Sequence, residues 1–344
     1  MTRSRLQQPG PALAAALVLA AWSAVAALPC PASAEPPAGE PGSRHVFTVE
    51  DGKTCLDGRP LRVIGLRCSN ALISGATTTQ LIENLDTFAD YGVNTVSVYF
   101  MGSRFGDVKG YRRDGSLDPV YARRMGRIIE AADARGMVVL VGCLYWSNSK
   151  AKWEDWTQTE ADAAVASTVA WLRANRYRNV FVDVDNEGMA HRAKGFDTRA
   201  MVRAGKAAWS ACVIASNDRA KPPPEADLGI HFAKRVAGKP YVESEATPSN
   251  APGGYWGRYS KRKGLYNYIN IGIYTDAMKA NQKRAAARHL DAGEGYMLAS
   301  TWLQCPPPDG PNMRPGGDGS PDRPGVRWWL EWVKTRYGPY RGPE

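Results

Sequence analysis

The chain has 344 residues, which is enough for one large domain or two small ones, and 44% of its residues are hydrophobic. Its formal net charge is +10, from 44 lysines and arginines against 34 aspartates and glutamates. Because the basic residues form short clusters such as Lys261-Arg262-Lys263, the charge does not by itself indicate a nucleic-acid-binding protein. We expect a basic, solvated surface or, as the alternative, a partner such as an acidic polysaccharide or an anionic cell-surface layer.

The first 34 residues have the layout of a secretory signal peptide. Arg3 and Arg5 precede an apolar run over residues 12–28, and the small residues at 32–34 form a cleavage site. Cleavage removes both arginines and no acid, so the net charge falls from +10 to +8. The apolar run is short for a membrane span, with a retained signal anchor as the alternative. We therefore expect a secreted or periplasmic protein that contacts neither nucleic acid nor, after cleavage, a membrane.

Five cysteines remain after cleavage, and this odd number leaves at least one thiol free. Cys55 and Cys68 are candidates for a disulfide bridge, whereas Cys143 and Cys212 lie in apolar runs and are expected in the core. Cys305 is the fifth. No pair of cysteines or histidines has the spacing of a zinc site, so the sequence predicts no metal centre.

After a lead-in at residues 35–44, expected to be disordered, the chain alternates between helical patterns and short apolar strands. A hairpin with turns at Asp51-Gly52 and Asp57-Gly58 opens this part. The predicted strands are 61–66, 95–100, 138–144, 180–185, 212–215, 228–232, 241–245 and 296–302, and the predicted helices are 79–91, 119–135, 160–176, 198–210, 274–292 and 326–337. Eight strands separated by crossovers predict a single (β/α)8 TIM barrel over residues 45–344.

The connections on either side of the sixth predicted strand are unusually short. Pro222-Pro223-Pro224 interrupts one of them, and residues 233–239 form the other. Neither has the length of a usual crossover helix, so we expect a barrel that is trimmed around strands five and six. No Gly-x-Gly-x-x-Gly follows the first strand, which argues against a dinucleotide-binding fold.

Two predicted strands end in carboxylic acids, at Asn186-Glu187 and at Glu245. Barrel enzymes place their catalytic residues at such strand tips. A retaining glycosidase needs two carboxyls about 5–5.5 Å apart, one as acid/base and one as nucleophile. Glu187 suits the first role and Glu245 the second, while Asn186 suits a hydrogen bond to a sugar hydroxyl. Glu243 competes with Glu245 because residues two apart on a strand share a face. The alternative is that these are solvated side chains where strands enter loops.

These motifs resemble those of the clan A glycoside hydrolases, retaining (β/α)8 enzymes that include cellulases and β-mannanases. The run from Asp183 to Glu187 is similar to the family's fourth strand, which ends in Asn-Glu, and Lys239 to Glu245 is similar to its seventh. The hairpin and the eighth predicted strand also resemble their counterparts. The resemblance implies a monomeric enzyme that cleaves O-glycosidic bonds of a polysaccharide or oligosaccharide by double displacement, with no cofactor.

Two departures from the family pattern stand out. Gly188 occupies the position after the acid, where the family usually has proline. The family also carries an arginine near the end of strand two that supports the nucleophile, and residues 96–100 contain none. Arg67 on strand one and Arg104 in the loop after strand two are both candidates to replace it. These gaps keep open a non-catalytic glycan-binding protein on the same barrel or, as a further alternative, a metal-dependent barrel hydrolase.

Four further residues are candidates for substrate binding. The resemblance places a cleft-lining histidine at His231 and a substrate-stacking tryptophan at Trp302. Tyr145 and Trp146 follow the third predicted strand, where aromatic faces would stack on sugars. For each of them, ordinary core or loop packing is the alternative.

Overall fold

The computed structural model describes residues 42–102, 108–146, 152–246, 276–298, 303 and 326–343; the side chains of residues 245, 246 and 278 lie outside this description. The expected signal peptide, Arg104, Trp302 and Cys305 therefore lie outside the described residues, as does most of the expected lead-in.

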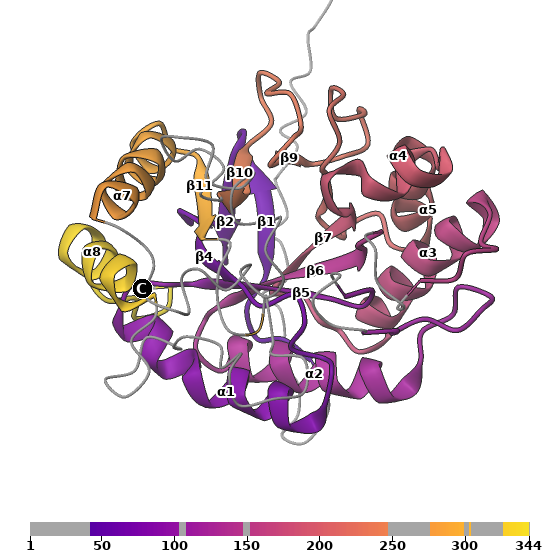
Figure 1. Cartoon of the computed structure of the whole chain (residues 1–344), viewed down its shortest axis with the longest axis horizontal. Coiled ribbons are helices and arrows are strands. Elements are labelled where there is room, and N and C mark those ends of the chain that lie inside the picture. Colours follow the sequence, from indigo (N-terminus) through magenta and orange to yellow (C-terminus); the bar gives the residue numbers. More distant parts are fainter. Residues whose placement is uncertain are drawn as a thin grey trace, which may run out of the picture. The chain divides into compact units, whose positions relative to one another are not determined.

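Eight parallel strands form a closed barrel, which confirms the predicted (β/α)8 fold (Figure 1). The strands follow one another around the barrel in the order β10-β11-β4-β5-β6-β7-β8-β9. Their bounds are β4 (Ile64–Arg67), β5 (Thr95–Tyr99), β6 (Val138–Leu144), β7 (Val180–Asp185), β8 (Ile214–Ser216), β9 (Leu228–Ile230), β10 (Tyr241–Ala246) and β11 (Gly295–Leu298). Because all strands run the same way, their C-terminal ends meet at one mouth of the barrel.

Helices pack against the outside of the barrel where the chain crosses from one strand to the next. They are α1 (Gly75–Asp90), α2 (Pro119–Asp133), α3 (Gln158–Ala174), α4 (Met189–Lys194), α5 (Thr198–Ala208), α7 (Asp276–Asp291) and α8 (Arg327–Tyr337). The long helices begin at residues that cap their free N–H groups: Ser74 and Thr157 form capping boxes, and Asp118 precedes a proline at the first helical position. No helix within the described ranges is long and apolar enough to cross a membrane.

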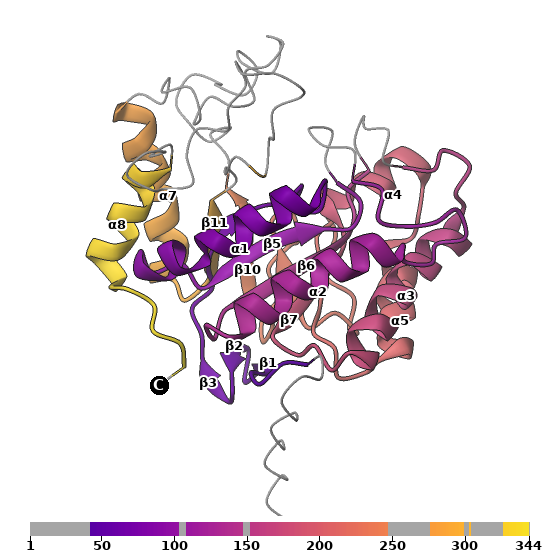
Figure 2. The same cartoon turned by 90° about the horizontal axis from the view of Figure 1, so that it is seen from below.

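The inward faces of the strands form an apolar plug at the N-terminal end of the barrel. Phe181, Leu140, Val242 and Met297 are all fully buried in this cluster. A small antiparallel sheet of β1 (Phe47–Glu50), β2 (Lys53–Leu56) and β3 (Arg59–Pro60) lies beside that end (Figure 2). The ring of Phe47 stacks on that of Phe181, with centroids 5.1 Å apart, so the predicted hairpin closes the bottom of the barrel.

The barrel is trimmed around β8 and β9, its fifth and sixth strands along the chain, as the short connections predict. β8 and β9 have three residues each. Residues 217–227 and 231–240 are all described, and neither connection contains a helix. No crossover helix therefore follows β8 or β9, although α5, which precedes β8, packs against that strand.

The predicted disulfide between Cys55 and Cys68 is wrong. The two cysteines are buried and form no disulfide with each other, and Cys143 and Cys212 are likewise buried and not joined by one. Cys55 lies in β2 at the closed end of the barrel, whereas Cys68 follows the C-terminal end of β4. The two thiols thus flank opposite ends of one strand, and closeness in sequence does not bring them together.

Candidate active site

The strand β7 presents a series of polar residues toward the mouth of the barrel. Val182 and Val184 pack outward against the helices, whereas Phe181 faces the interior. Because side chains alternate along a strand, Asp183 shares the inward face with Phe181, one layer closer to the mouth. Asp183 and Asn186 are both fully buried.

The turn after β7 has a left-handed backbone. Asn186–Gly188 form a single 3-10 turn in which Glu187 has φ 56° and ψ 16°, and Gly188 has φ 61°. This conformation costs a residue with a Cβ about 1–2 kcal/mol, and such strain concentrates at functional sites. Proline fixes φ near −65°, so it cannot occupy position 188 in this turn. The departure from the family's Asn-Glu-Pro pattern therefore follows from the backbone.

The side chain of Asp185 ends β7 by capping the next helix. Its two oxygens accept hydrogen bonds from the backbone N–H groups of Ala190 and His191, at 2.9 and 3.0 Å. Burial raises the pKa of this carboxyl to about 7, although both hydrogen bonds act in the opposite direction. Asp185 thus holds the start of α4, which sequence periodicity did not predict.

Arg67 joins the tips of β7 and β10. It is the last residue of β4 and is fully buried. Its Nη2 donates to Asn186 Oδ1 at 3.0 Å, and its Nη1 donates to the carbonyl of Ser244 at 3.3 Å. Of the two candidate arginines, the structure therefore brings Arg67 next to the residue that precedes Glu245, while Arg104 lies outside the described residues.

A buried hydrogen-bonded chain lies directly beneath Asn186. The Tyr99 hydroxyl is 2.6 Å from Asp183 Oδ2 and 3.1 Å from Asn186 Oδ1, and Asn217 Nδ2 donates to the same Asp183 oxygen at 2.9 Å. Burial raises the pKa of Asp183, opposed by these hydrogen bonds and by the charge of Arg67.

Sequence reasoning did not single out Tyr99, Asp183 or Asn217. One signal was available for Tyr99: Gly142 lies opposite it in β6, and a Cβ at Gly142 would come 2.0 Å from the Tyr99 ring. A glycine inside a strand often marks such a close approach. A charged residue on the inward face of the apolar strand β7 was the signal for Asp183.

The amide of Asn186 has one orientation that its neighbours accept. Its Oδ1 accepts from Arg67 and lies 3.1 Å from the Tyr99 hydroxyl, so turning the amide over would set its N–H groups against that of Arg67. Its Nδ2 is buried and has no hydrogen-bond partner within the described part of the chain. A buried donor of this kind favours an incoming acceptor.

The two glutamates of β10 do not lie on a regular strand. Val242 and Glu243 pair with Gly295 and Tyr296, but Ala246 pairs with Leu298, so β10 has one extra residue between these pairs. Such a bulge breaks the alternation of side chains, so Glu243 and Glu245 need not share a face. The main chain of Glu245 lies in β10, and its side chain lies outside the described residues.

Glu243 is engaged on the outer face of the barrel, opposite the inward-facing Val242. Its Oε1 lies 2.5 Å from His231 Nδ1, and its Oε2 lies 3.3 Å from the Tyr241 hydroxyl. His231 itself follows β9 with φ 46°. The structure thus brings the predicted substrate-binding His231 to Glu243, in the region where the barrel lacks a crossover helix.

The aromatic residues after β6 are packed into protein. Tyr145 is 4% exposed, and its ring lies 5.4 Å from that of Tyr99 and 5.6 Å from the Arg67 guanidinium. Trp146 is also 4% exposed and packs against Trp156 and Phe196. These contacts leave little of either ring for a sugar. Trp302 lies outside the described residues.

The carboxyl of Glu187 lies near the surface of the mouth. Its side chain is 16% exposed, and its Oε2 lies 4.0 Å from Arg192 Nη2 in α4. Arg192 also donates to the main-chain carbonyl of Glu187. The helix that Asp185 caps therefore supplies a cation beside the predicted acid/base.

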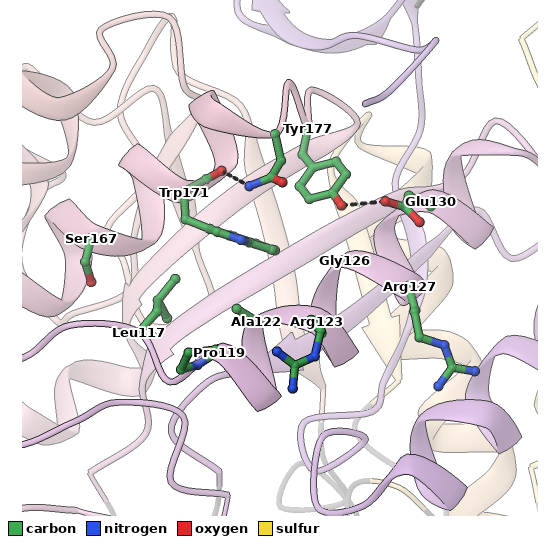
Figure 3. Close-up of a pocket in the computed structure, with 11 residues that line it drawn as sticks. Leu117, Pro119, Ala122, Arg123, Gly126, Arg127, Glu130, Ser167, Trp171 and Tyr177 are labelled. Atoms are coloured by element: carbon green, nitrogen blue, oxygen red, sulfur yellow. Dashed lines mark hydrogen bonds between the residues drawn. The ribbon is translucent and has the colours of Figure 1, made fainter. Parts of the chain in front are cut away.

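A separate groove lies between α2 and α3 on the outer wall of the barrel (Figure 3). It has a volume of about 610 Å³ and is lined in part by Trp171 and Tyr177, whose hydroxyl donates to Glu130 at 2.6 Å. None of the strand-tip residues lines it. Among the described residues, no group of three or more His, Cys, Asp or Glu side chains is arranged to hold a metal ion.

The comparison with known proteins rests on structure. No protein-family model matches the sequence, and a search of curated proteins gives no match. A family 5 glycoside hydrolase from Bacteroides vulgatus is similar, with TM-score 0.53 and 13% identity over 85% of this chain and 71% of that chain. A β-glucanase from Saccharophagus degradans in complex with cellotetraose has TM-score 0.53 and 13% identity over 86% of this chain and 94% of that one.

A β-1,4-D-mannanase from Cryptopygus antarcticus has TM-score 0.50 and 11% identity, over 87% of this chain and 98% of that chain. At such identities the likeness establishes the fold. The chain has the closed (β/α)8 barrel found in family 5 glycoside hydrolases, as the resemblance of its motifs predicts.

Proposed function

We propose that the chain is a retaining glycoside hydrolase of polysaccharides or oligosaccharides, with Glu187 as acid/base and Glu245 as nucleophile. The observation that carries this proposal is the position of Arg67, which contacts Asn186 at the tip of β7 and the carbonyl of Ser244 in β10. Residues adjacent to Glu187 and Glu245 are thereby tied to one buried cation. The similar fold of cellotetraose-bound β-glucanase and of β-1,4-D-mannanase supports the same class of reaction.

In the first step, Glu187 gives its proton to the glycosidic oxygen while the Glu245 carboxylate attacks the anomeric carbon. The bond to the leaving sugar breaks, and a covalent glycosyl-enzyme forms. In the second step, Glu187 takes a proton from water as the water oxygen displaces Glu245. The Asn186 Nδ2 donor binds a hydroxyl of the sugar and fixes it relative to both carboxyls. No step requires a cofactor.

Substrate class and cellular location complete the proposal. β-linked glucans and mannans are the first substrates to examine, because the similar structures include enzymes named for them. The predicted signal peptide supports secretion or export to the periplasm, where the enzyme would contact such polymers. The proposed enzyme acts as a monomer.

The test is hydrolysis of a panel of polysaccharides and aryl β-glycosides by the wild type, E187Q, E245A and the control E243Q. We expect the hydrolytic activity of E187Q toward polymers to be about 10²–10⁴-fold lower than that of the wild type. E245A should lose all measurable turnover, and E243Q should retain most of it. Circular dichroism checks that each variant folds. Full activity in E245A together with loss of activity in E243Q would identify Glu243 as the nucleophile. Saccharide binding without cleavage by the wild type would identify a glycan-binding protein instead.

A further inference from the structure

Asp183 is a fully buried carboxyl that has no part in the double displacement described above. A buried carboxyl requires compensating partners. The groups that face it are Arg67 from β4, Tyr99 from β5, Asp185 on its own strand and Asn217 after β8, whereas Cys143 of β6 lies on the outer face of the barrel. Of these, only Arg67 carries a positive charge, and it is also the residue that holds Asn186.

The contact through Tyr99 links Asp183 to the site. A tyrosine hydroxyl has one proton to donate. Here it has two neighbouring acceptors, Asp183 Oδ2 at 2.6 Å and Asn186 Oδ1 at 3.1 Å. An ionised Asp183 takes that proton, whereas a neutral Asp183 can donate to Tyr99 and turn the hydroxyl toward Asn186. The state of Asp183 therefore sets how firmly the Asn186 amide is held.

We propose that Asp183 is a positioning residue of the hydrolase site, which acts through Tyr99 on the amide of Asn186. The inference rests on the proposed function. It gives the inward-facing acid of β7 a role that the strand-tip motif alone does not assign.

The variant D183N removes the charge and one of the two acceptor oxygens. Tyr99 and Asn217 donate to one oxygen of Asp183, and the backbone N–H of Asp185 donates to the other at 3.3 Å, so an amide in that place sets its own N–H groups against one of these donors. Y99F removes the link itself and leaves Asp183 in place. S97A is the matched control, because Ser97 is a buried polar residue on the same strand as Tyr99 whose hydroxyl has no partner in the described part of the chain.

We expect D183N and Y99F each to lower kcat about 10–100-fold, with a smaller change in KM, since misplaced groups cost rate more than binding. The double variant should be no slower than the slower single variant, because both residues act along one chain of contacts.

A second measurement does not depend on hydrolysis. In ¹⁵N-labelled protein, the side-chain amide signals of Asn186 should shift in D183N and in Y99F and stay in place in S97A. Unchanged amide signals in folded D183N and Y99F would overturn the inference. A double variant whose loss of kcat equals the product of the two single losses would also overturn it. A wild type that cleaves no substrate while the amide signals still shift would refute the proposed function and leave the link between Asp183 and Asn186 established.

Discussion

The lower and upper layers of the barrel interior differ in what holds them together, although the same strands supply both. On β7, Phe181 packs into the apolar plug with Leu140 and Met297, whereas Asp183, one layer higher, is held by hydrogen bonds. The lower layer gains stability from burial of apolar surface. The upper layer buries charged and polar groups, which is unfavourable unless every partner is present. In a barrel this division places stability at the N-terminal end and chemistry at the C-terminal end.

The largest expected effect on stability belongs to the lower layer. Phe181→Ala removes a fully buried ring that stacks on Phe47, so we expect the free energy of unfolding to fall by about 3–5 kcal/mol. Denaturant titration measures this change. The kcat per folded molecule should stay within a factor of about two, because Phe181 lies in the apolar plug, one layer below Asp183. A large loss of kcat with unchanged stability would break the division between the layers.

In the upper layer the expected effect is on rate. Arg67→Lys keeps the charge but cannot reach both Asn186 and the Ser244 carbonyl with one ammonium group. We expect kcat to fall about 10²-fold, which corresponds to about 2.7 kcal/mol of transition-state stabilisation. The control is Arg62→Lys, an exposed arginine before the other end of β4 that lies over the Tyr337 ring. Equal activity in the two variants would mean that the contacts of Arg67 do not matter for turnover.

A smaller effect is expected at the turn that carries Glu187. Gly188→Ala places a Cβ at φ 61° and 3.0 Å from Asp218 Cβ, so we expect a loss of about 1–2 kcal/mol in unfolding free energy. The control is Gly75→Ala at the start of α1, where a Cβ meets nothing within 4 Å and φ is not left-handed. If Gly188→Ala is as stable as this control, the turn is not strained.

The smallest effect concerns pH and Asp185. Since burial raises the pKa of this carboxyl to about 7, the folded state binds more protons than the unfolded state between about pH 4 and pH 7. Its contribution to stability is therefore lost as pH rises through that window, by about 1 kcal/mol from pH 6 to pH 7. The difference in unfolding free energy between wild type and D185N should shrink by that amount over the same interval. A difference that stays constant would show that Asp185 titrates at its ordinary pKa.

The sequence predicted the scaffold well where local signals decide it. The strands β6 and β7 were predicted to the residue because β6 is an almost wholly apolar run and β7 is an apolar run that ends in alternating valines and aspartates. The trimmed strands were anticipated from the lengths of their connections. The helix α4 was missed because it has six residues and depends on the Asp185 cap and the left-handed turn before it.

The site was harder to predict because its contacts join distant parts of the chain. Nothing in the sequence near Arg67 indicates that it reaches Asn186, 119 positions away. The bulge in β10 left no local signal either, so the competition between Glu243 and Glu245 stayed open. Tyr145 and Trp146 have the composition of a sugar platform, but their rings pack against partners that only the fold brings close.

Trapping of the covalent intermediate tests the central claim most directly. The wild type is incubated with 2-deoxy-2-fluoro glucosides and mannosides carrying an activated leaving group, and the labelled peptide is identified by mass spectrometry. The fluorine slows the second step, so a retaining enzyme accumulates its glycosyl-enzyme. We predict one sugar per protein on Glu245, no label in E245A, and inactivation at the same rate as labelling. Hydrolysis of the matching aryl glycoside without any label, or with label on Glu243, would contradict the account.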